Sequence, residues 1–165
     1  MIRLAGYLAF TAALASSVAW AQQPKDPAGE FTGIFAHINK KVLDMAKDFP
    51  AEKYDYKLRP EMRSFGAVIV HIASGNVFAA EAGKGGKVKW TELNPADFQT
   101  KAQAVALLEK SIADATATLK SLPADKFHQT VEPWLSVIEH SAEHYGLLVA
   151  YFRANGIVPP ASRKK

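Results

Sequence analysis

Residues 62–82, MRSFGAVIVHIASGNVFAAEA, restrict the fold more than any other stretch of the chain. Apolar side chains occupy nearly every side of a helical wheel drawn for this segment, instead of one stripe. A helix of this kind is normally buried on most sides, because apolar surface left in water is unfavourable. The segment therefore predicts a helix enclosed by other elements, and Ser64 is a suitable residue to cap its N-terminus.

Three further segments have the 3.6-residue apolar spacing of amphipathic helices, and they cover residues 28–48, 101–122 and 133–155. Pro50 ends the first of them, and Gly156 is well placed to cap the last. No alternating strand pattern of useful length is present. Four helices of about 20 residues each predict an all-α fold, a four-helix bundle.

The connections at residues 51–60 and 83–100 are long, which suits at least one crossover between helices, and residues 124–132 are expected to form a third loop. Trp90 and Phe98 are the expected anchors of the second connection. That connection begins with GKGG, but it lacks the spacing and the Lys-Ser/Thr pair of a phosphate-binding loop.

The first 21 residues have the layout of a secretory signal peptide. Arg3 gives a positive start, residues 4–18 are mostly apolar, and Ala19-Trp20-Ala21 is a small-x-small cleavage site. The apolar run is short for an uncleaved membrane anchor, which needs roughly 20 residues. We therefore expect cleavage after Ala21 and a periplasmic or secreted protein with no stable membrane anchor.

We expect residues 22–160 to form one domain and residues 161–165 to form a basic, solvated tail. The chain has no cysteine, so the domain depends on packing alone or on packing and a metal, and a cysteine thiolate of the chain is excluded both as a catalyst and as a metal ligand. The net charge of +4 is due mainly to Arg3 and the tail. A nucleic-acid-binding domain should have a basic face, and none is visible. The expected partner is a small-molecule substrate or ligand; a homodimer stays open.

His140 and His144 lie four residues apart and therefore share one face of the last predicted helix. Two imidazoles at this spacing can share a metal ion, although the spacing alone is a weak signal. Glu139 and Glu143 each precede a histidine and are turned about 100° from it. The zinc protease pattern needs Glu where Ser141 stands, and the di-iron pattern needs Glu-x-x-His, so neither is met.

His71 lies in the middle of the apolar helix, where an imidazole needs a partner because an unpaired buried polar group is costly. A hydrogen bond is the simplest partner for His71 alone. Together with His140 and His144 it would make a three-histidine site with open positions, which suits Zn, Ni or Fe(II). His37 and His128 are expected at the surface. Covalent haem is excluded because Cys-x-x-Cys-His is absent, whereas a bundle that binds haem non-covalently stays open as a further alternative.

The runs RSFGAVIVHIASGNVF at residues 63–78 and HSAEHYGLLVAYFRANGIVPPASR at residues 140–163 resemble the DinB/YfiT-like superfamily. The resemblance covers essentially the whole mature chain. It implies a four-helix bundle in an up-down-down-up order, with His71, His140 and His144 around a divalent metal ion. Relatives include thiol-dependent S-transferases, isomerases and hydrolases, so the resemblance leaves the reaction open. Those transferases work in the cytoplasm with a low-molecular-weight thiol. An exported protein would lie outside that compartment.

Two functions are compatible with these observations. The first is a metal-dependent transferase or hydrolase of unknown substrate, in which the metal activates a water or a thiol. The second is a non-catalytic bundle of the cell envelope that holds a metal or a small ligand. The candidates for substrate contact are side chains of the last helix near the histidines and the two arginines that bracket Pro60: Tyr145, Glu143, Trp134, Arg59 and Arg63.

Overall fold

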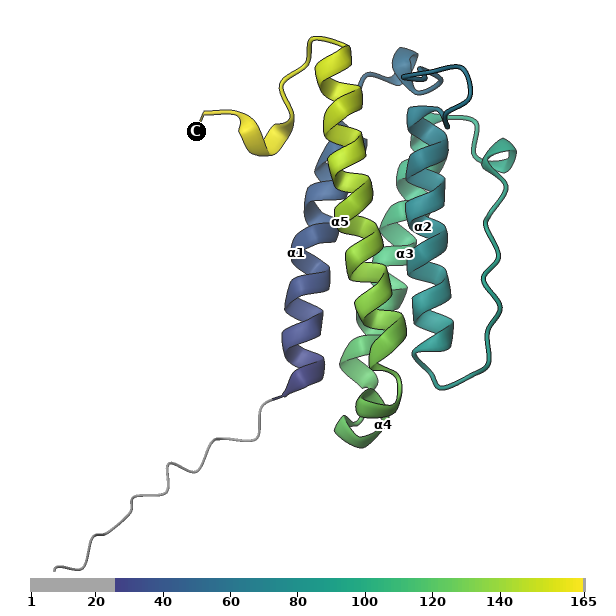
Figure 1. The fold of residues 1–165 in the computed structure, drawn as a ribbon, viewed down its shortest axis with the longest axis vertical. Helices are drawn as coiled ribbons and strands as arrows, with labels where there is room; N and C mark the ends of the chain where they lie inside the picture. Colours follow the sequence, from purple (N-terminus) through teal and green to yellow (C-terminus); the bar gives the residue numbers. More distant parts are fainter. Residues whose placement is uncertain (1–25, 165) are drawn as a thin grey trace, which may run out of the picture.

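The structure, a computed structural model, describes residues 26–164, and the predicted signal peptide lies outside these residues. Four long helices form a bundle (Figure 1): α1 (Pro27–Asp48), α2 (Phe65–Ala82), α3 (Lys101–Ser121) and α5 (Val131–Ala154). A short helix, α4 (Ala124–Gln129), joins α3 to α5. The described part of the chain contains no strand, so the predicted all-α fold is confirmed.

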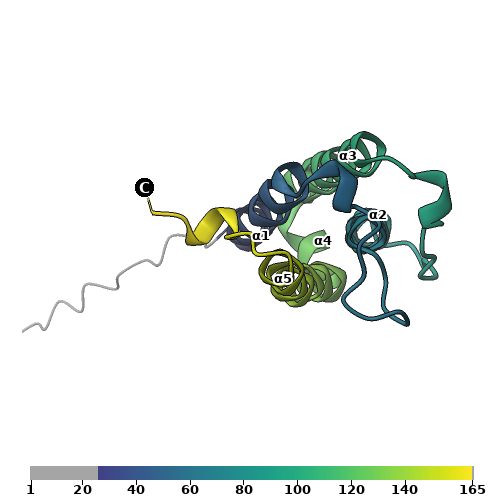
Figure 2. The same ribbon diagram turned by 90° about the horizontal axis from the view of Figure 1, so that it is seen from above.

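Figure 2, a view from above, shows the four long helices packed side by side as a bundle. α2 packs between α3 and α5, and α1 packs between the same two helices on the other side. The segment 83–100 runs alongside α2 (Figure 1). By length and composition α2 could cross a membrane, but 67% of it is buried within the bundle. The helix that is apolar on every side is thus a core helix, as its pattern predicts.

α2 begins at Phe65, three residues later than the sequence predicts. Its first turn is capped by Ser64, whose hydroxyl accepts a hydrogen bond from the N–H of Ala67 at 3.3 Å. The preceding loop is tied to this turn because the Tyr54 carbonyl accepts a hydrogen bond from the N–H of Gly66 at 2.8 Å. The capping residue and the end of the helix at Ala82 were therefore predicted correctly, and the predicted start was three residues too early.

The segment predicted as a loop at residues 124–132 contains α4, and α5 begins at Val131, before the predicted Pro133. Phe127 accounts for this short helix. Its side chain is only 1% exposed, and its ring packs edge-on against Phe31 of α1 with 5.1 Å between the centroids. Burying one aromatic side chain at this end of the bundle stabilises a turn of helix that has little amphipathic pattern of its own.

The C-terminal end of α5 confirms the predicted cap, because Gly156 has a φ of +70°. Arg163, in the predicted tail, is exposed and makes an ion pair. Its guanidinium donates to the Asp48 carboxylate, at 2.9 Å for the Nη1 hydrogen bond, and to the carbonyl of Val158. The hydrogen bond from Arg163 lowers the pKa of the Asp48 carboxyl. The chain after α5 is thereby fastened to the end of α1.

A layer of buried polar side chains separates two apolar clusters of the core. α1, α2 and α3 each contribute one member, respectively Asn39, Asn76 and Ser111. The Asn76 amide donates to Asn39 Oδ1 at 3.3 Å and to Ser111 Oγ at 3.2 Å. On α5, Ser141 is also fully buried. Asn76 Oδ1 and Ser141 Oγ have no hydrogen-bond partner among the described residues.

We expect Asn76→Ala to lower the free energy of unfolding by about 1–3 kcal/mol, because it leaves two buried acceptors without their donor. Val77→Ala is the matched control on the same helix, since Val77 is 40% exposed, and its effect should stay within about 0.5 kcal/mol. Equilibrium unfolding in urea measures both. Equal losses in the two variants would contradict the role given to the polar layer.

Candidate metal centre

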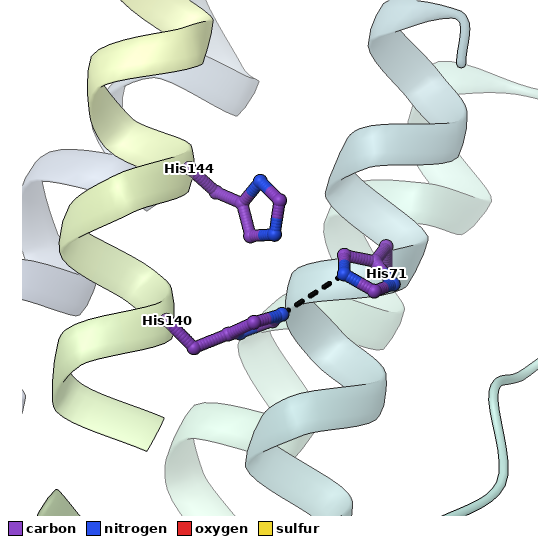
Figure 3. A group of neighbouring side chains, drawn as sticks. All are labelled: His71, His140 and His144. Carbon is purple, nitrogen blue, oxygen red and sulfur yellow. Dashed lines mark hydrogen bonds between the residues drawn. The ribbon is translucent and has the colours of Figure 1, made fainter. Parts of the chain in front are cut away.

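Three histidines from two helices meet at the packing interface of α2 and α5 (Figure 3). His71 comes from α2, and His140 and His144 come from successive turns of α5. One ring nitrogen of each lies within 4.8 Å of the other two. The Nε2 atoms of His71 and His140 are 2.9 Å apart. The structure thus brings together the three histidines that the sequence analysis selected.

Gly75 allows α5 to approach α2 closely enough for this contact. A Cβ atom at Gly75 would lie 2.8 Å from Nδ1 of His140, closer than real Cβ contacts allow. Any other residue at this position would push the His140 ring away from the backbone of α2. Because His71 lies one turn earlier on α2, the glycine also sets the separation of the two imidazoles.

Glu92 was missed by the sequence analysis. Its Oε1 atom lies 3.0 Å from Nδ1 of His71, and its Oε2 atom accepts a hydrogen bond from Nη2 of Arg63 at 3.0 Å. The Nδ1–H group of His71 can donate to this carboxylate and leave the Nε2 lone pair directed at His140. Metal-binding histidines are commonly supported in this way on their other ring nitrogen.

The segment 83–100 is tied to α2 next to Glu92. The Ser74 hydroxyl accepts a hydrogen bond from the N–H of Leu93 at 3.0 Å and donates to the Val70 carbonyl at 2.9 Å. Trp90, in the same segment, lies with its ring centroid 5.9 Å from that of His71. The only sequence signal for Glu92 was one acidic residue in a connection without periodicity, and this cannot predict a contact with a distant helix.

Burial keeps the histidines neutral. It is the main cause that lowers the pKa of His140 and of His144 to about 4, with the neighbouring histidines and Arg63 contributing. Burial and then Arg63 also lower the pKa of His71, against the opposing effect of Glu92. Neutral imidazole is the form that binds metal ions, so the cluster can accept a cation near neutral pH without first losing protons.

The donor set fits a divalent ion. Two nitrogens on one tetrahedral ion lie about 3.3 Å apart, whereas the Nε2 atoms of His71 and His140 are 2.9 Å apart. A separation of the rings by roughly 0.4 Å would convert the hydrogen-bonded pair into two ligands. Three imidazoles leave at least one coordination position for water or a substrate.

Two hollows flank the histidines. The hollow on the His144 side has a volume of about 550 Å³ and a mixed lining that includes Arg63. The hollow on the His140 side has a volume of about 230 Å³ and is lined mainly by apolar groups, including Trp90 and Phe78. A hollow of about 600 Å³ elsewhere contains no histidine, so volume alone would not locate this site.

Two of the five predicted substrate contacts, Tyr145 and Trp134, lie on α5 like His140 and His144 but pack against other side chains. The Tyr145 ring lies under Lys41 of α1, with 4.1 Å from Nζ to the ring centroid. Trp134 is fully buried in the core and packs edge-on against Phe35, with 6.5 Å between the ring centroids. Trp134 lines neither hollow beside the histidines. A helical wheel gives the direction of a side chain but not its depth.

Of the other three candidates, only Arg63 lines a hollow beside the histidines. Arg63 lines the larger hollow beside His144 and pairs with Glu92. Glu143 and Arg59 are exposed and line neither of the two hollows.

The two remaining histidines, His37 and His128, are exposed, as predicted.

Residues 35–154 match the family model described as DinB superfamily. The match covers well over half of the chain and contains His71, His140 and His144. The chain therefore belongs to the DinB superfamily. A search of curated proteins found no match to the chain.

The depressed pKa values predict how the metal-free protein responds to acid. The folded state keeps His140 and His144 neutral down to about pH 4, whereas the unfolded chain takes up protons below their ordinary pKa of 6.5. The free energy of unfolding should therefore decrease as the pH falls from 6.5 to about 4. Urea unfolding at several pH values should show a shallower decrease in His140→Gln/His144→Gln. His128→Gln, at an exposed position, should follow the wild type; identical pH profiles in all three proteins would contradict the assignment.

Proposed function

We propose that this protein is a metal-dependent transferase or hydrolase whose divalent ion is held by His71, His140 and His144. The observation that carries the proposal is the convergence of three neutral ring nitrogens, one of them backed by Glu92. Membership of the DinB superfamily supports the same site. Nitrogen donors of this number suit Zn, Ni or Fe(II).

A divalent ion bound here would lower the pKa of a water or a thiol and supply a nucleophile near neutral pH. The protein's own residues would orient the substrate. The hollow on the His144 side is the wider approach, and the Arg63 guanidinium beside it favours substrates with negative charge. Pairing with Glu92 reduces this preference without removing it, because Arg63 is 48% exposed.

The alternative is a non-catalytic bundle that holds a metal or a small ligand. The limited access to His71, whose side chain is only 14% exposed, favours it. The two functions differ in whether a bound ion keeps an exchangeable water. Water-proton relaxation measured on the Mn²⁺- or Fe²⁺-loaded protein distinguishes them: enhanced relaxation supports catalysis, and its absence supports storage or structure.

The proposal includes the up-down-down-up order of helices implied by the family resemblance. The course of the segment 83–100 supports it, because this segment runs alongside α2 before α3 begins (Figure 1). A connection of this kind lets α2 and α3 point the same way.

We expect zinc-reconstituted wild type to retain about one ion per chain after gel filtration, and His140→Ala to lose most of it, because removing one of three ligands weakens binding strongly. His128→Ala is the matched control, since His128 is exposed. Inductively coupled plasma mass spectrometry gives the metal content. Full occupancy in His140→Ala would overturn the assignment.

We also propose export to the periplasm or the medium, supported by the charged, apolar and small-residue regions of residues 1–21. In a bacterial host, intact mass spectrometry of the exported fraction should find a chain that begins at Gln22. Ala21→Arg should accumulate as the unprocessed form, because the cleavage site needs a small residue there. Gln22→Asn, one residue later, should be processed normally. An exported wild-type chain that keeps Met1 would contradict cleavage.

A further inference from the structure

Two side chains from different connections converge on the outer nitrogen of His71. Glu92 lies in the segment between α2 and α3, and Arg63 lies in the segment between α1 and α2. The Glu92 carboxylate bridges them, with 3.0 Å from Oε1 to Nδ1 of His71 and 3.0 Å from Oε2 to Nη2 of Arg63. Both segments are themselves held. Leu93 is hydrogen-bonded to Ser74, and the Arg63 carbonyl accepts a hydrogen bond from the Tyr151 hydroxyl.

The hydrogen-bond chemistry of this arrangement selects one tautomer. A neutral imidazole has one N–H group, and an ionised carboxylate can only accept. Nδ1 of His71 must therefore carry the proton that Glu92 accepts, and Nε2 must keep its lone pair. The 2.9 Å contact between the Nε2 atoms is then a hydrogen bond from His140 to His71. Proton donation runs from His140 to His71 to Glu92, and Arg63 donates to Glu92 from the other side.

We propose that Glu92, oriented by Arg63, is a positioning residue that fixes the Nδ1-protonated tautomer of His71 and thereby presents Nε2 to the metal. The consequence for metal affinity rests on the proposed function. The tautomer does not, because it follows from the contacts that Glu92 makes with Nδ1 of His71 and with Arg63.

Glu92 is not itself a fourth ligand of this site. Its carboxylate lies against Nδ1, on the opposite side of the imidazole ring from the Nε2 atom that faces His140. To reach the ion, Glu92 would have to abandon both His71 and Arg63. Its contribution therefore passes through His71.

The ion pair between Glu92 and Arg63 contributes little to the stability of the fold. The side chains are 31% and 48% exposed, and exposed pairs of this kind are weak. Variants at Glu92 should therefore fold, so a loss of metal affinity can be separated from a loss of structure.

The first test is metal affinity. Zn²⁺ dissociation constants, measured by competition with a chelator, should increase about 10- to 100-fold in Glu92→Ala. Glu92→Gln should lose less, because its amide oxygen can still accept from Nδ1–H. Asp97→Asn, an exposed acidic residue of the same segment, is the charge-matched control and should bind like the wild type. Zinc binding by Glu92→Ala within twofold of the wild type would overturn the proposal.

Arg63→Met tests the orienting partner, because it leaves the carboxylate in place without its second contact. Its Zn²⁺ dissociation constant should lie between those of the wild type and Glu92→Ala. The absorption spectrum of the Co²⁺-loaded protein, which reports ligand geometry, should change in Glu92→Ala and stay unchanged in Asp97→Asn. A wild-type dissociation constant in Arg63→Met would remove Arg63 from the proposal.

The second test uses metal-free protein and distinguishes this inference from the proposed function. Long-range ¹H–¹⁵N correlation spectra at neutral pH should show that Nδ1 of His71 is protonated in the wild type and in Asp97→Asn. In Glu92→Ala the proton should move towards Nε2, with Glu92→Gln partly rescued. If no metal binds but these spectra are obtained, the function fails and the tautomer assignment stands. An Nε2-protonated His71 in the wild type would overturn the inference itself.

Discussion

The close contact between α5 and α2 at Gly75 is the constraint on which the site depends. Without a side chain at that position, the His140 ring can lie against the backbone of α2 and reach His71. The cost is a glycine inside a helix, roughly 1 kcal/mol relative to alanine. Burial of α2 between α3, α5 and the segment 83–100 can offset this cost. The same contact between α2 and α5 therefore buries the apolar helix and brings the histidines together.

The helices could be predicted because burial in this fold follows the 3.6-residue period. α3 has almost the predicted bounds, and Gly156 ends α5 as expected. The errors occur where a single side chain decides the local structure. Ser64 delays the start of α2, and Phe127 creates α4 within a predicted loop. Neither effect extends over enough residues to produce a period that a sequence pattern could reveal.

The site was predictable as far as its residues lie on regular helices. His140 and His144 share a face by spacing alone, whereas the family resemblance was needed to join His71 to them. Glu92 could not be found in this way, because its position depends on the path of an irregular connection held by Ser74. Trp134 was selected because it lies on the same helix as His140 and His144, but it is buried in the core, and a sequence pattern does not give the depth of a side chain.

The buried polar layer has a consequence for how much sequence change the site can tolerate. Asn76 directly follows Gly75, and Ser141 directly follows His140, so on both helices a member of the buried polar set adjoins a residue that shapes the site. Sliding α5 by one residue would exchange a fully buried hydroxyl for an imidazole and misalign the histidines at once. Burial of these polar side chains in the core therefore fixes the register of α5 against α2, and with it the positions of the histidines. The two flanking hollows could diversify to accept other ligands while the spacing of the imidazoles stayed fixed.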